Sequence, residues 1–578
     1  MSEGRVTFRR MGWLTLLVWA ACAWPAWAQA PADAAPAEGI PVQSDLVRAK
    51  CGSCHRSDDK LRMSRISYRR ATPENWERTI KRMVTLNHVN LEPADARSIL
   101  KYLADRQGLA PEEARPIQFE AERRTIEYTY AADQDASDNC SACHTIARVL
   151  GERRTKEEWG LLLAMHRGYY PLVDTQPMNG GQGWRRTRTA QTEPQADGRP
   201  PDNRHPMDKV LEHLEKALPL TTSAWSSWSA AMQPPNLAGR WAIVGSFPGK
   251  GAVYGQVTIV VDAAAPDSFT TETRYTFART GETTTRTGKA LVYTGFQWRG
   301  RGAAAGASAD PWREVLTVER DWKTMSGRWF TGAYDETGID VTLTRLSSEP
   351  VVFGASASAL KTAAAAPALK IFGANLPAGV TPDDIRLGRG VKVTRVISAR
   401  PDEIAVDVEV AADAPIGARD LSIAGTVKPS ALVVYDKIDG VKVLPQAGMA
   451  RVGGSVFPKQ LQQFEAVGIN NGPDGKPDTA DDLNLGAVSV KWSLEEYTAT
   501  FGDDDLGFVG ALDQSGLFTP NVDGPNPKRT GSRNNIGDVW VVAELNNPST
   551  AARPLRARAH LLVTVPLYMA WFQSEGAQ

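Results

Sequence analysis

Two pentapeptides carry the residues of this chain that could do chemistry: Cys51-Gly52-Ser53-Cys54-His55 and Cys140-Ser141-Ala142-Cys143-His144. Two thiols at this spacing can add across the two vinyl groups of one porphyrin, and the adjacent histidine can bind its iron. A C-x-x-C pair alone would also suit a redox dithiol or half of a zinc site. The histidine directly after the second cysteine favours haem. The sequence therefore predicts two covalently bound haem c groups, attached through Cys51, Cys54, Cys140 and Cys143, with His55 and His144 as proximal iron ligands.

The N-terminal residues predict export. Arginines at positions 5, 9 and 10 precede an apolar run over residues 11–24, and small residues follow at Ala26 and Ala28. This is the pattern of a signal peptide over residues 1–28, and the run is shorter than the ~20 residues of a membrane span. One of the five cysteines, Cys22, lies in this segment, and the other four belong to the haem motifs. Covalent haem together with export predicts a periplasmic protein that has no cysteine left for a disulfide.

Composition and missing motifs narrow the function. The chain has 578 residues, enough for several domains, and its 66 Lys and Arg equal its 66 Asp and Glu. The chain therefore has no net positive charge that would attract nucleic acid or an anionic membrane. The sequence contains no dinucleotide or phosphate-loop fingerprint, no H-E-x-x-H and no G-x-S-x-G. We expect a chain that carries electrons and has no catalytic residues of its own.

Residues 42–222, after a linker over 29–41, are predicted to form an all-α tandem dihaem cytochrome c domain. Its two repeats span about 42–110 and 125–220. After each motif a threonine suited to cap a helix is followed four residues later by tryptophan: Thr72 with Trp76, and Thr155 with Trp159. Glu158 is expected to complete a capping box with Thr155. A long loop over about 168–205 is inserted only in the second repeat.

The distal iron ligands are predicted from these two helices. Met83 and His166 occupy matching positions on the face that carries the tryptophan. Thioether and imidazole are the usual sixth ligands of electron-transfer haem. We expect Met83 at the first haem, with Met63 and His88 as competing candidates, and His166 at the second. Methionine ligation raises the reduction potential, so electrons would run from the second haem to the first.

From about residue 234 the sequence predicts β-structure: short segments rich in Thr and Val, separated by Gly, Asp and Pro. We expect three all-β domains: an antiparallel barrel or sandwich over 235–347, an immunoglobulin-like sandwich over 350–435, and a second one with long loops over 436–578. Acidic residues over 470–482 are spaced somewhat like a calcium loop. They lack the bidentate glutamate and the flanking helices, so a solvated hairpin is favoured.

The chain resembles the alpha, dihaem cytochrome c subunit of quinohemoprotein amine dehydrogenase. The resemblance rests on the two haem motifs, on helices ending in Lys81-Arg82-Met83 and in residues 164–171, and on the order of the domains. It implies a heterotrimer with a β-propeller subunit and a small subunit that bears cysteine tryptophylquinone. Primary amines would be oxidised there to aldehyde and ammonia. Electrons would pass through both haems to an external cytochrome c or a blue copper protein. Because every cysteine of the mature chain is assigned to haem, the quinone must lie on a partner.

Two other functions fit the motifs. A dihaem peroxidase would need an open distal site at one haem, and a high-spin spectrum or peroxide turnover would reveal it. A standalone dihaem electron carrier, whose β-domains only bind a partner or a surface, would purify without other subunits.

Overall fold

The computed structural model describes residues 38–117, 130–140, 144–169, 192, 194, 198–304, 311–454, 456–498, 504–546 and 554–566. The predicted signal peptide and Cys143 lie outside these ranges, as does most of the predicted 168–205 insertion. Residues from Gly39 onward form one contiguous unit. Within the described ranges, none of the helices has both the length and the apolar run needed to cross a lipid bilayer.

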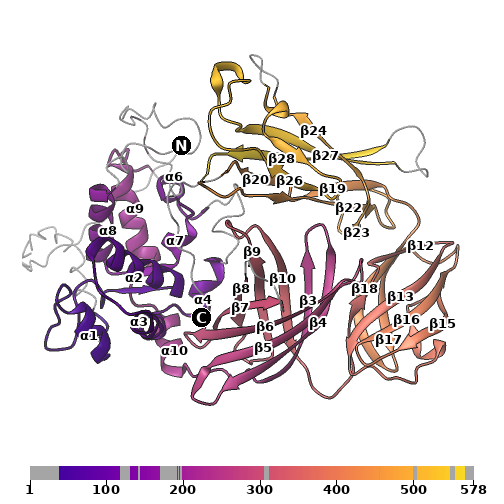
Figure 1. Cartoon of the computed structure of the whole chain (residues 1–578), viewed down its shortest axis with the longest axis horizontal. Coiled ribbons are helices and arrows are strands. Elements are labelled where there is room, and N and C mark those ends of the chain that lie inside the picture. The colour runs from indigo at the N-terminus through magenta and orange to yellow at the C-terminus, as the bar shows by residue number, and fades with distance from the viewer. Residues whose placement is uncertain are drawn as a thin grey trace, which may run out of the picture. The chain divides into compact units, whose positions relative to one another are not determined.

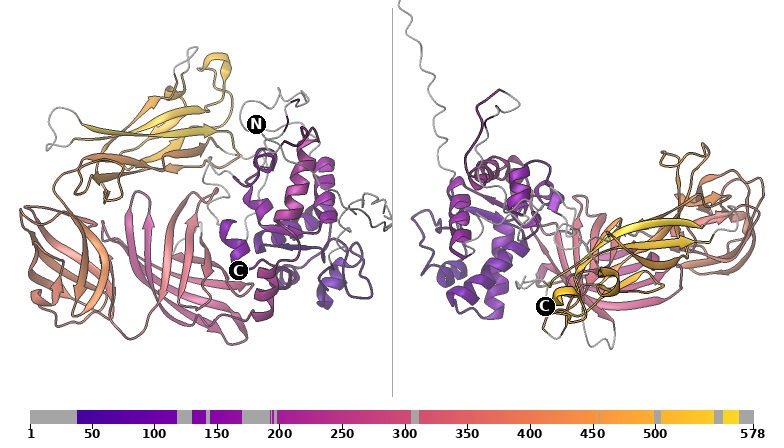
Figure 2. Two further views of the ribbon diagram at one scale, coloured as in Figure 1. Left: turned by 180° about the vertical axis from the view of Figure 1, so that it is seen from behind. Right: turned by 90° about the horizontal axis from the view of Figure 1, so that it is seen from above.

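The region that carries the haem motifs is mainly helical (Figures 1 and 2). The helices are α1 (Asp45–Cys51), α2 (Pro73–Asn87), α3 (Pro93–Arg106), α4 (Pro111–Ala114), α6 (Gln134–Cys140), α7 (Ala147–Leu150), α8 (Lys156–Tyr169), α9 (Pro206–Ala217) and α10 (Ser223–Ala231), with a 3-10 turn at Arg115–Ile117.

The two predicted helix starts are confirmed. The Oγ1 atom of Thr72 accepts from the backbone N–H of Asn75, and that of Thr155 accepts from Glu158, each at 3.3 Å. Trp76 and Trp159 are buried, 2% and 1% exposed, and each donates its indole N–H to a backbone carbonyl. The two tryptophans therefore lie in two apolar cores, one in each repeat.

Two expectations for this domain are wrong. It is not all-α, because β1 (Arg69–Ala71) and β2 (Glu152–Arg154) pair antiparallel and join the repeats. Each strand has only three residues and needs a partner far along the chain, so neither has a local pattern. The capping box is also not formed, since the N–H of Thr155 donates to the carbonyl of Tyr68 (3.4 Å) and the Glu158 carboxylate pairs with Arg65.

The next domain is a closed eight-stranded antiparallel barrel, which settles the predicted alternative of barrel or sandwich. Its strands follow the order β10-β3-β4-β5-β6-β7-β8-β9. Alternate side chains point inward and form one core that includes Trp241, Trp298 and Trp329. The strands are β3 (Gly239–Phe247), β4 (Gly251–Asp262), β5 (Ala265–Phe277), β6 (Thr283–Tyr293), β7 (Gln297–Ala304), β8 (Trp312–Val318), β9 (Thr324–Thr331) and β10 (Thr337–Arg345).

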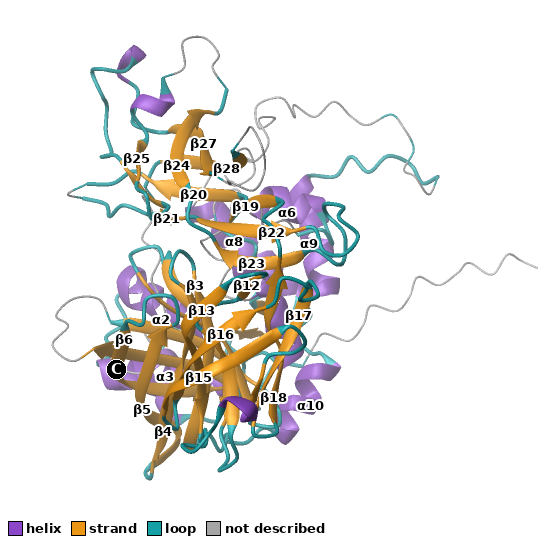
Figure 3. Cartoon of the chain, turned by 90° about the vertical axis from the view of Figure 1, so that its right-hand side faces the viewer, coloured by secondary structure: helices purple, strands orange, loops and turns teal. Residues whose placement is uncertain are grey.

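The third domain consists of two four-stranded sheets around one core (Figure 3). The sheet orders are β11-β13-β16-β15 and β12-β18-β17-β14. This is a sandwich, while its immunoglobulin-like character stays a prediction. The strands are β11 (Val351–Ala355), β12 (Ala359–Lys361), β13 (Ala365–Ala374), β14 (Ile385–Arg386), β15 (Val391–Ala399), β16 (Glu403–Val410), β17 (Gly417–Ile423) and β18 (Thr426–Tyr435).

The last domain has sheets of order β19-β22-β23, β20-β28-β27-β24 and β21-β26-β25, packed on a shared core. Its immunoglobulin-like assignment also stays a prediction. The strands are β19 (Gly440–Leu444), β20 (Ala447–Arg451), β21 (Gln462–Gln463), β22 (Glu465–Asn470), β23 (Leu483–Ala487), β24 (Lys491–Glu496), β25 (Gly510–Leu512), β26 (Leu517–Pro520), β27 (Gly537–Leu545) and β28 (Leu555–Thr564).

Candidate functional site

The first haem motif begins at the end of α1. The side chain of Ser44 starts this helix by accepting from the N–H of Val47, and Cys51 is its last residue. The N–H of His55 donates to the carbonyl of Cys51 (2.9 Å), which continues the turn and brings thiol and imidazole to one side. Cys51 packs on the core of the first repeat, whereas Cys54 is exposed. Burial and the neighbouring Cys54 raise the pKa of the Cys51 thiol.

The second motif begins in the same way, because Cys140 is the last residue of α6 and packs on the core of the second repeat. Burial, with a smaller contribution from Asp133, raises the pKa of its thiol to about 12. A reactive or metal-binding cysteine needs an accessible thiolate, which these apolar surroundings oppose. A neutral thioether suits the same surroundings. The residues present therefore fit a covalently attached haem better than a dithiol or a zinc site.

The three histidines predicted as iron ligands share one hydrogen-bond pattern. The Nδ1 atom of His55 donates to the carbonyl of Ser64 (2.9 Å), and that of His144 donates to the carbonyl of Thr145 (2.9 Å). The Nδ1 atom of His166 donates to the carbonyl of Leu162 (2.8 Å). A carbonyl can only accept, so each ring carries its proton on Nδ1. This bond orients the ring and makes Nε2 the metal-binding nitrogen, as is usual for histidine ligands.

Electrostatics keep the imidazoles of the second site neutral. Burial lowers the pKa of His144 to about 3, and the positive charges of Arg148 and Arg78 lower it further. Burial also lowers the pKa of His166. A neutral imidazole is the form that binds iron.

The candidates for the distal ligand of the first haem lie in different places. Met83 is half-buried one turn beyond Ile80 on α2, and its sulfur accepts a weak hydrogen bond from Asn87 (3.6 Å). His88 is exposed and ends α2 in a left-handed conformation. Met63 is fully buried in the core that also contains Cys51. It directly precedes Ser64, whose carbonyl accepts from His55.

The two repeats meet across β1 and β2 with approximate two-fold symmetry. Arg69, Arg70 and Ala71 pair with Arg154, Arg153 and Glu152, respectively. The pairing extends by one hydrogen bond at each end, because Thr72 N–H donates to the Gly151 carbonyl (3.1 Å) and Thr155 N–H donates to the Tyr68 carbonyl (3.4 Å). The symmetry brings equivalent residues of the two repeats to opposite sides of one short ladder.

The carboxylate of Glu113 pairs with both arginines at the centre of this ladder, Arg70 and Arg153. Glu113 on α4 lies 2.7 Å from Arg70 Nη1 and 3.3 Å from Arg153 Nε, and all three side chains are at most 8% exposed. Glu113 also accepts from the Ala110 N–H (2.9 Å) and the Thr222 hydroxyl (2.8 Å). Hydrogen bonds and charge from Arg70, with charge from Arg153, outweigh burial and lower the pKa of Glu113 to about 2. Glu113 thus joins both repeats to the start of α10.

A second buried carboxylate lies beside it. Glu152 pairs with Arg69 and Arg154, each at 2.6 Å. The positive charges of Arg154 and Arg69 outweigh burial and lower the pKa of Glu152 to about 2. This charge network was missed by the sequence analysis. The sequence did contain a signal for it: Arg69-Arg70-Ala71 directly precedes Thr72, and Arg153-Arg154 directly precedes Thr155.

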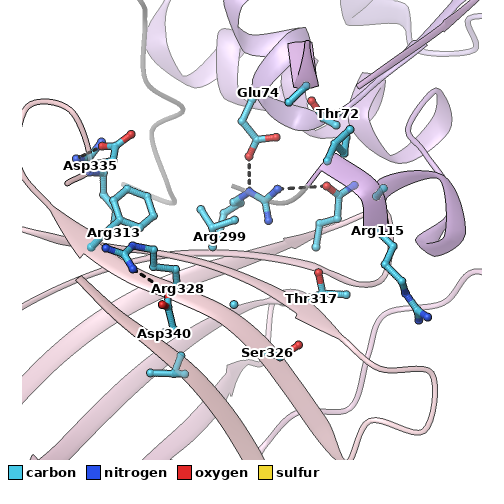
Figure 4. A pocket seen from close by; sticks show the side chains of 18 of the residues that line it. Thr72, Glu74, Arg115, Arg299, Arg313, Thr317, Ser326, Arg328, Asp335 and Asp340 are labelled. Carbon is cyan, nitrogen blue, oxygen red and sulfur yellow. Dashed lines mark hydrogen bonds and ion pairs between the residues drawn. The ribbon is translucent and has the colours of Figure 1, made fainter. Parts of the chain in front are cut away.

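A cavity of about 610 Å³ separates α2 from the barrel (Figure 4). Arg299 of β7 reaches from the barrel to Glu74 in the first turn of α2. Arg313 pairs with Asp335 (2.5 Å), and Arg328 pairs with Asp340 (2.7 Å). The arginines drawn there from the barrel are therefore neutralised by neighbouring carboxylates. We assign this cavity to the junction between domains.

The acidic segment 470–482 connects β22 and β23, so the predicted hairpin is confirmed. Asp481 accepts from the Asp474 N–H (3.1 Å), Asp482 accepts from the Asp478 N–H (2.9 Å), and Lys442 pairs with Asp478 (3.0 Å). Across the described part of the chain, no three His, Cys, Asp or Glu side chains are grouped to hold a metal ion.

Solved structures share only parts of the chain. A redesigned β-barrel is 16% identical over 19% of this chain and 92% of its own, with a TM-score of 0.17. Another redesigned barrel, mFAP1 bound to DFHBI, is 19% identical over 19% and 94%, with a TM-score of 0.17. Human protocadherin-24 EC1-2 is 11% identical over 37% and 97%, with a TM-score of 0.15. These TM-scores support no functional inference. No curated protein matches the chain.

Four family profiles match the chain in succession, and all describe one protein. The haem-binding profile of the quinohemoprotein amine dehydrogenase alpha subunit matches residues 42–205. The profiles of its domains II, III and IV match residues 234–346, 350–436 and 441–575. These matches extend over nearly all of the predicted mature chain. The chain therefore belongs to the family of quinohemoprotein amine dehydrogenase alpha subunits, a haem-binding component of a multisubunit oxidoreductase.

Proposed function

We propose that this chain is the dihaem electron-transfer subunit of a periplasmic amine dehydrogenase. Two covalent haem c groups would supply the redox centres between a cysteine tryptophylquinone on a small partner subunit and an external cytochrome c or blue copper protein. A β-propeller subunit would complete the assembly. The observation that carries this proposal is the hydrogen bond shared by His55, His144 and His166: each donates from Nδ1 to a backbone carbonyl, which leaves Nε2 to bind iron.

The chain's own residues would hold and insulate the two haems. Cys51 and Cys140 lie against apolar cores, which exclude water from one side of each attachment site. The imidazoles of His144 and His166 lie in the field of three positive charges, those of Arg148, Arg78 and Arg82. This field favours added negative charge at the second haem site. Such a field favours the reduced state of a neighbouring redox centre.

The structure favours Met83 over Met63 as distal ligand of the first haem. A distal ligand must approach the iron from the face opposite the proximal histidine. Met63 directly precedes Ser64, whose carbonyl bonds the Nδ1 atom of His55 and so lies behind the proximal ring. Met83 lies instead on α2, at the position that matches His166 on α8. We therefore retain His55 with Met83, and His144 with His166, as the proposed ligand pairs.

Met83→Leu is expected to abolish methionine ligation at the first haem, because leucine has similar volume but no sulfur. The near-infrared absorption of the oxidised protein should lose its methionine-to-iron band, while the second haem keeps its spectrum. Met63→Leu is the matched control and should retain the band. Loss of the band in the Met63 variant, and its retention in the Met83 variant, would reverse the assignment.

The function is tested by purifying the native protein under mild conditions and identifying its partners by mass spectrometry. We expect a small subunit with a quinone-modified tryptophan, a β-propeller subunit, and reduction of both haems when a primary amine is added. A dihaem chain that purifies alone and is not reduced by amine would instead support a standalone carrier. Turnover of peroxide with a high-spin haem would support a peroxidase.

A further inference from the structure

Each repeat contacts the proximal loop of the other repeat through one buried residue. These residues are Asn75 on α2 and Glu158 on α8, which are 5% and 4% exposed. Both are the third residue of their helix, and both donate their backbone N–H to the capping threonine. Each also precedes the proposed distal ligand on its helix by the same number of residues. The two positions are therefore equivalent in the repeat.

Asn75 belongs to the first repeat but bonds the second. Its side-chain amide donates to the carbonyl of Arg148 (2.9 Å), and the N–H of Arg148 donates to the carbonyl of Thr145 (3.2 Å). That same Thr145 carbonyl accepts from Nδ1 of His144 (2.9 Å). A continuous series of hydrogen bonds thus runs from α2 to the proximal histidine of the second haem.

Glu158 belongs to the second repeat but pairs with the first. Its Oε2 atom lies 2.9 Å from Nε of Arg65, and 3.5 Å from Nη1 of Arg154 in its own repeat. Arg65 is held in the left-handed region at φ 68° and follows Ser64, whose carbonyl accepts from Nδ1 of His55. A non-glycine residue needs support in that region. The ion pair with the buried Glu158 carboxylate provides it, while the Arg65 side chain itself is 38% exposed. Glu158 thereby fixes the loop that orients the proximal histidine of the first haem.

We propose that Asn75 and Glu158 are positioning residues that act across the repeat boundary, so that each repeat sets the proximal ligand geometry of the other repeat's haem. The inference rests on the proposed function, because it treats His55 and His144 as iron ligands. The hydrogen bond from Nδ1 to a carbonyl makes the imidazole a stronger ligand and stabilises the oxidised iron. Loosening the loop that carries the carbonyl should raise the reduction potential of that haem.

The test is an EPR-monitored redox titration of the native assembly, in which each oxidised haem has its own signal. Glu158→Gln should raise the potential of the first haem and leave the second unchanged, although Glu158 shares α8 with His166. Asn75→Ala should raise the potential of the second haem and leave the first unchanged. Equal shifts of both haems, or shifts of the haem in the mutated repeat, would overturn the proposal.

Matched variants separate this effect from other causes. Glu157→Gln removes a charge from the exposed neighbour of Glu158 and should move neither potential. Arg65→Gln should raise the reduction potential of the first haem as Glu158→Gln does. Adding Glu158→Gln to Arg65→Gln should change that potential little further, because the ion pair between the two residues is already lost. Since Asn75 also accepts from Arg78 (3.0 Å), Asn75→Ala is repeated in an Arg78→Gln chain and compared with Arg78→Gln alone, and the second-haem shift should persist. A different result in either double variant would contradict the proposed contacts between the repeats. A chain without covalent haem would refute the proposed function itself.

Discussion

Replacing Cys140 and Cys143 together by alanine is expected to leave one covalently bound haem in place of two and to stop amine-dependent reduction of the external acceptor. The thioethers anchor the porphyrin, and His144 alone would bind it reversibly. The mass of the denatured chain should fall by one haem, and the redox titration should lose one step. The double variant Cys51→Ala with Cys54→Ala should lose the other haem and the other step.

Ser53→Ala is the matched control for the cysteine variants, since it changes a residue within a motif but no thiol. It should keep both haems and full electron flow. If the Cys140 and Cys143 variant kept two haems after denaturation, the second pentapeptide would not be an attachment site.

Glu113→Gln is expected to destabilise the haem domain by about 3–5 kcal/mol, the range for removing one partner of a buried ion pair. Glutamine keeps the shape but leaves Arg70 and Arg153 without their shared negative charge. Urea unfolding followed by haem absorbance measures the change in this domain. Haem absorbance is preferred because the whole chain, with its several domains, does not unfold in one step.

The pH dependence of that stability gives an independent check. The pKa of Glu113 is lowered from about 4.5 in the unfolded chain to about 2 in the folded chain. Its stabilisation is therefore complete above about pH 4.5 and is lost as the pH falls toward about 2. The Gln variant should lack the part of the acid dependence that Glu113 causes.

Glu112→Gln is the control for Glu113, because it neutralises the adjacent residue of α4. Glu112 pairs with Arg320 at the surface, where both side chains are more than half exposed. Such pairs contribute at most about 1 kcal/mol, so the control should unfold nearly as the parent does. Equal destabilisation by the two variants would show that Glu113 has no special role.

The sequence was most informative where chemistry depends on neighbouring residues. A thioether site needs two cysteines and a histidine within five positions, and a helix cap needs a threonine within one turn of the backbone N–H that donates to it. Thr72 and Thr155 therefore cap as predicted. The barrel was foreseen only as one of two alternatives, because closure depends on the pairing of β3 with β10, at opposite ends of the domain.

Glu158 shows why local patterns can mislead. Its position relative to Thr155 favours a capping box, which needs no tertiary contact. In the folded chain the carboxylate is buried, and its nearest cationic partner is Arg65 of the other repeat at 2.9 Å, with Arg154 of its own repeat at 3.5 Å. A buried carboxylate gains more from a guanidinium than from a backbone N–H, since an unpaired charge there costs several kcal/mol. The contact with another repeat therefore prevails over the local cap.

The sequence by itself determined the family, the order of the domains and the two predicted haem attachment sites, because these follow from covalent chemistry and from local patterns. Only the tertiary structure showed how the two sites are joined: the β1–β2 ladder, the sharing of Glu113 by two equivalent arginines, and the crossed contacts of Asn75 and Glu158. These contacts link residues that lie 40 to 93 positions apart: Glu113 and Arg153 are the nearest pair, and Arg65 and Glu158 are the farthest. The arginines before each capping threonine mark the charged strands, but no local pattern names their partners, because burial of the charges at the repeat boundary selects each partner in the folded chain.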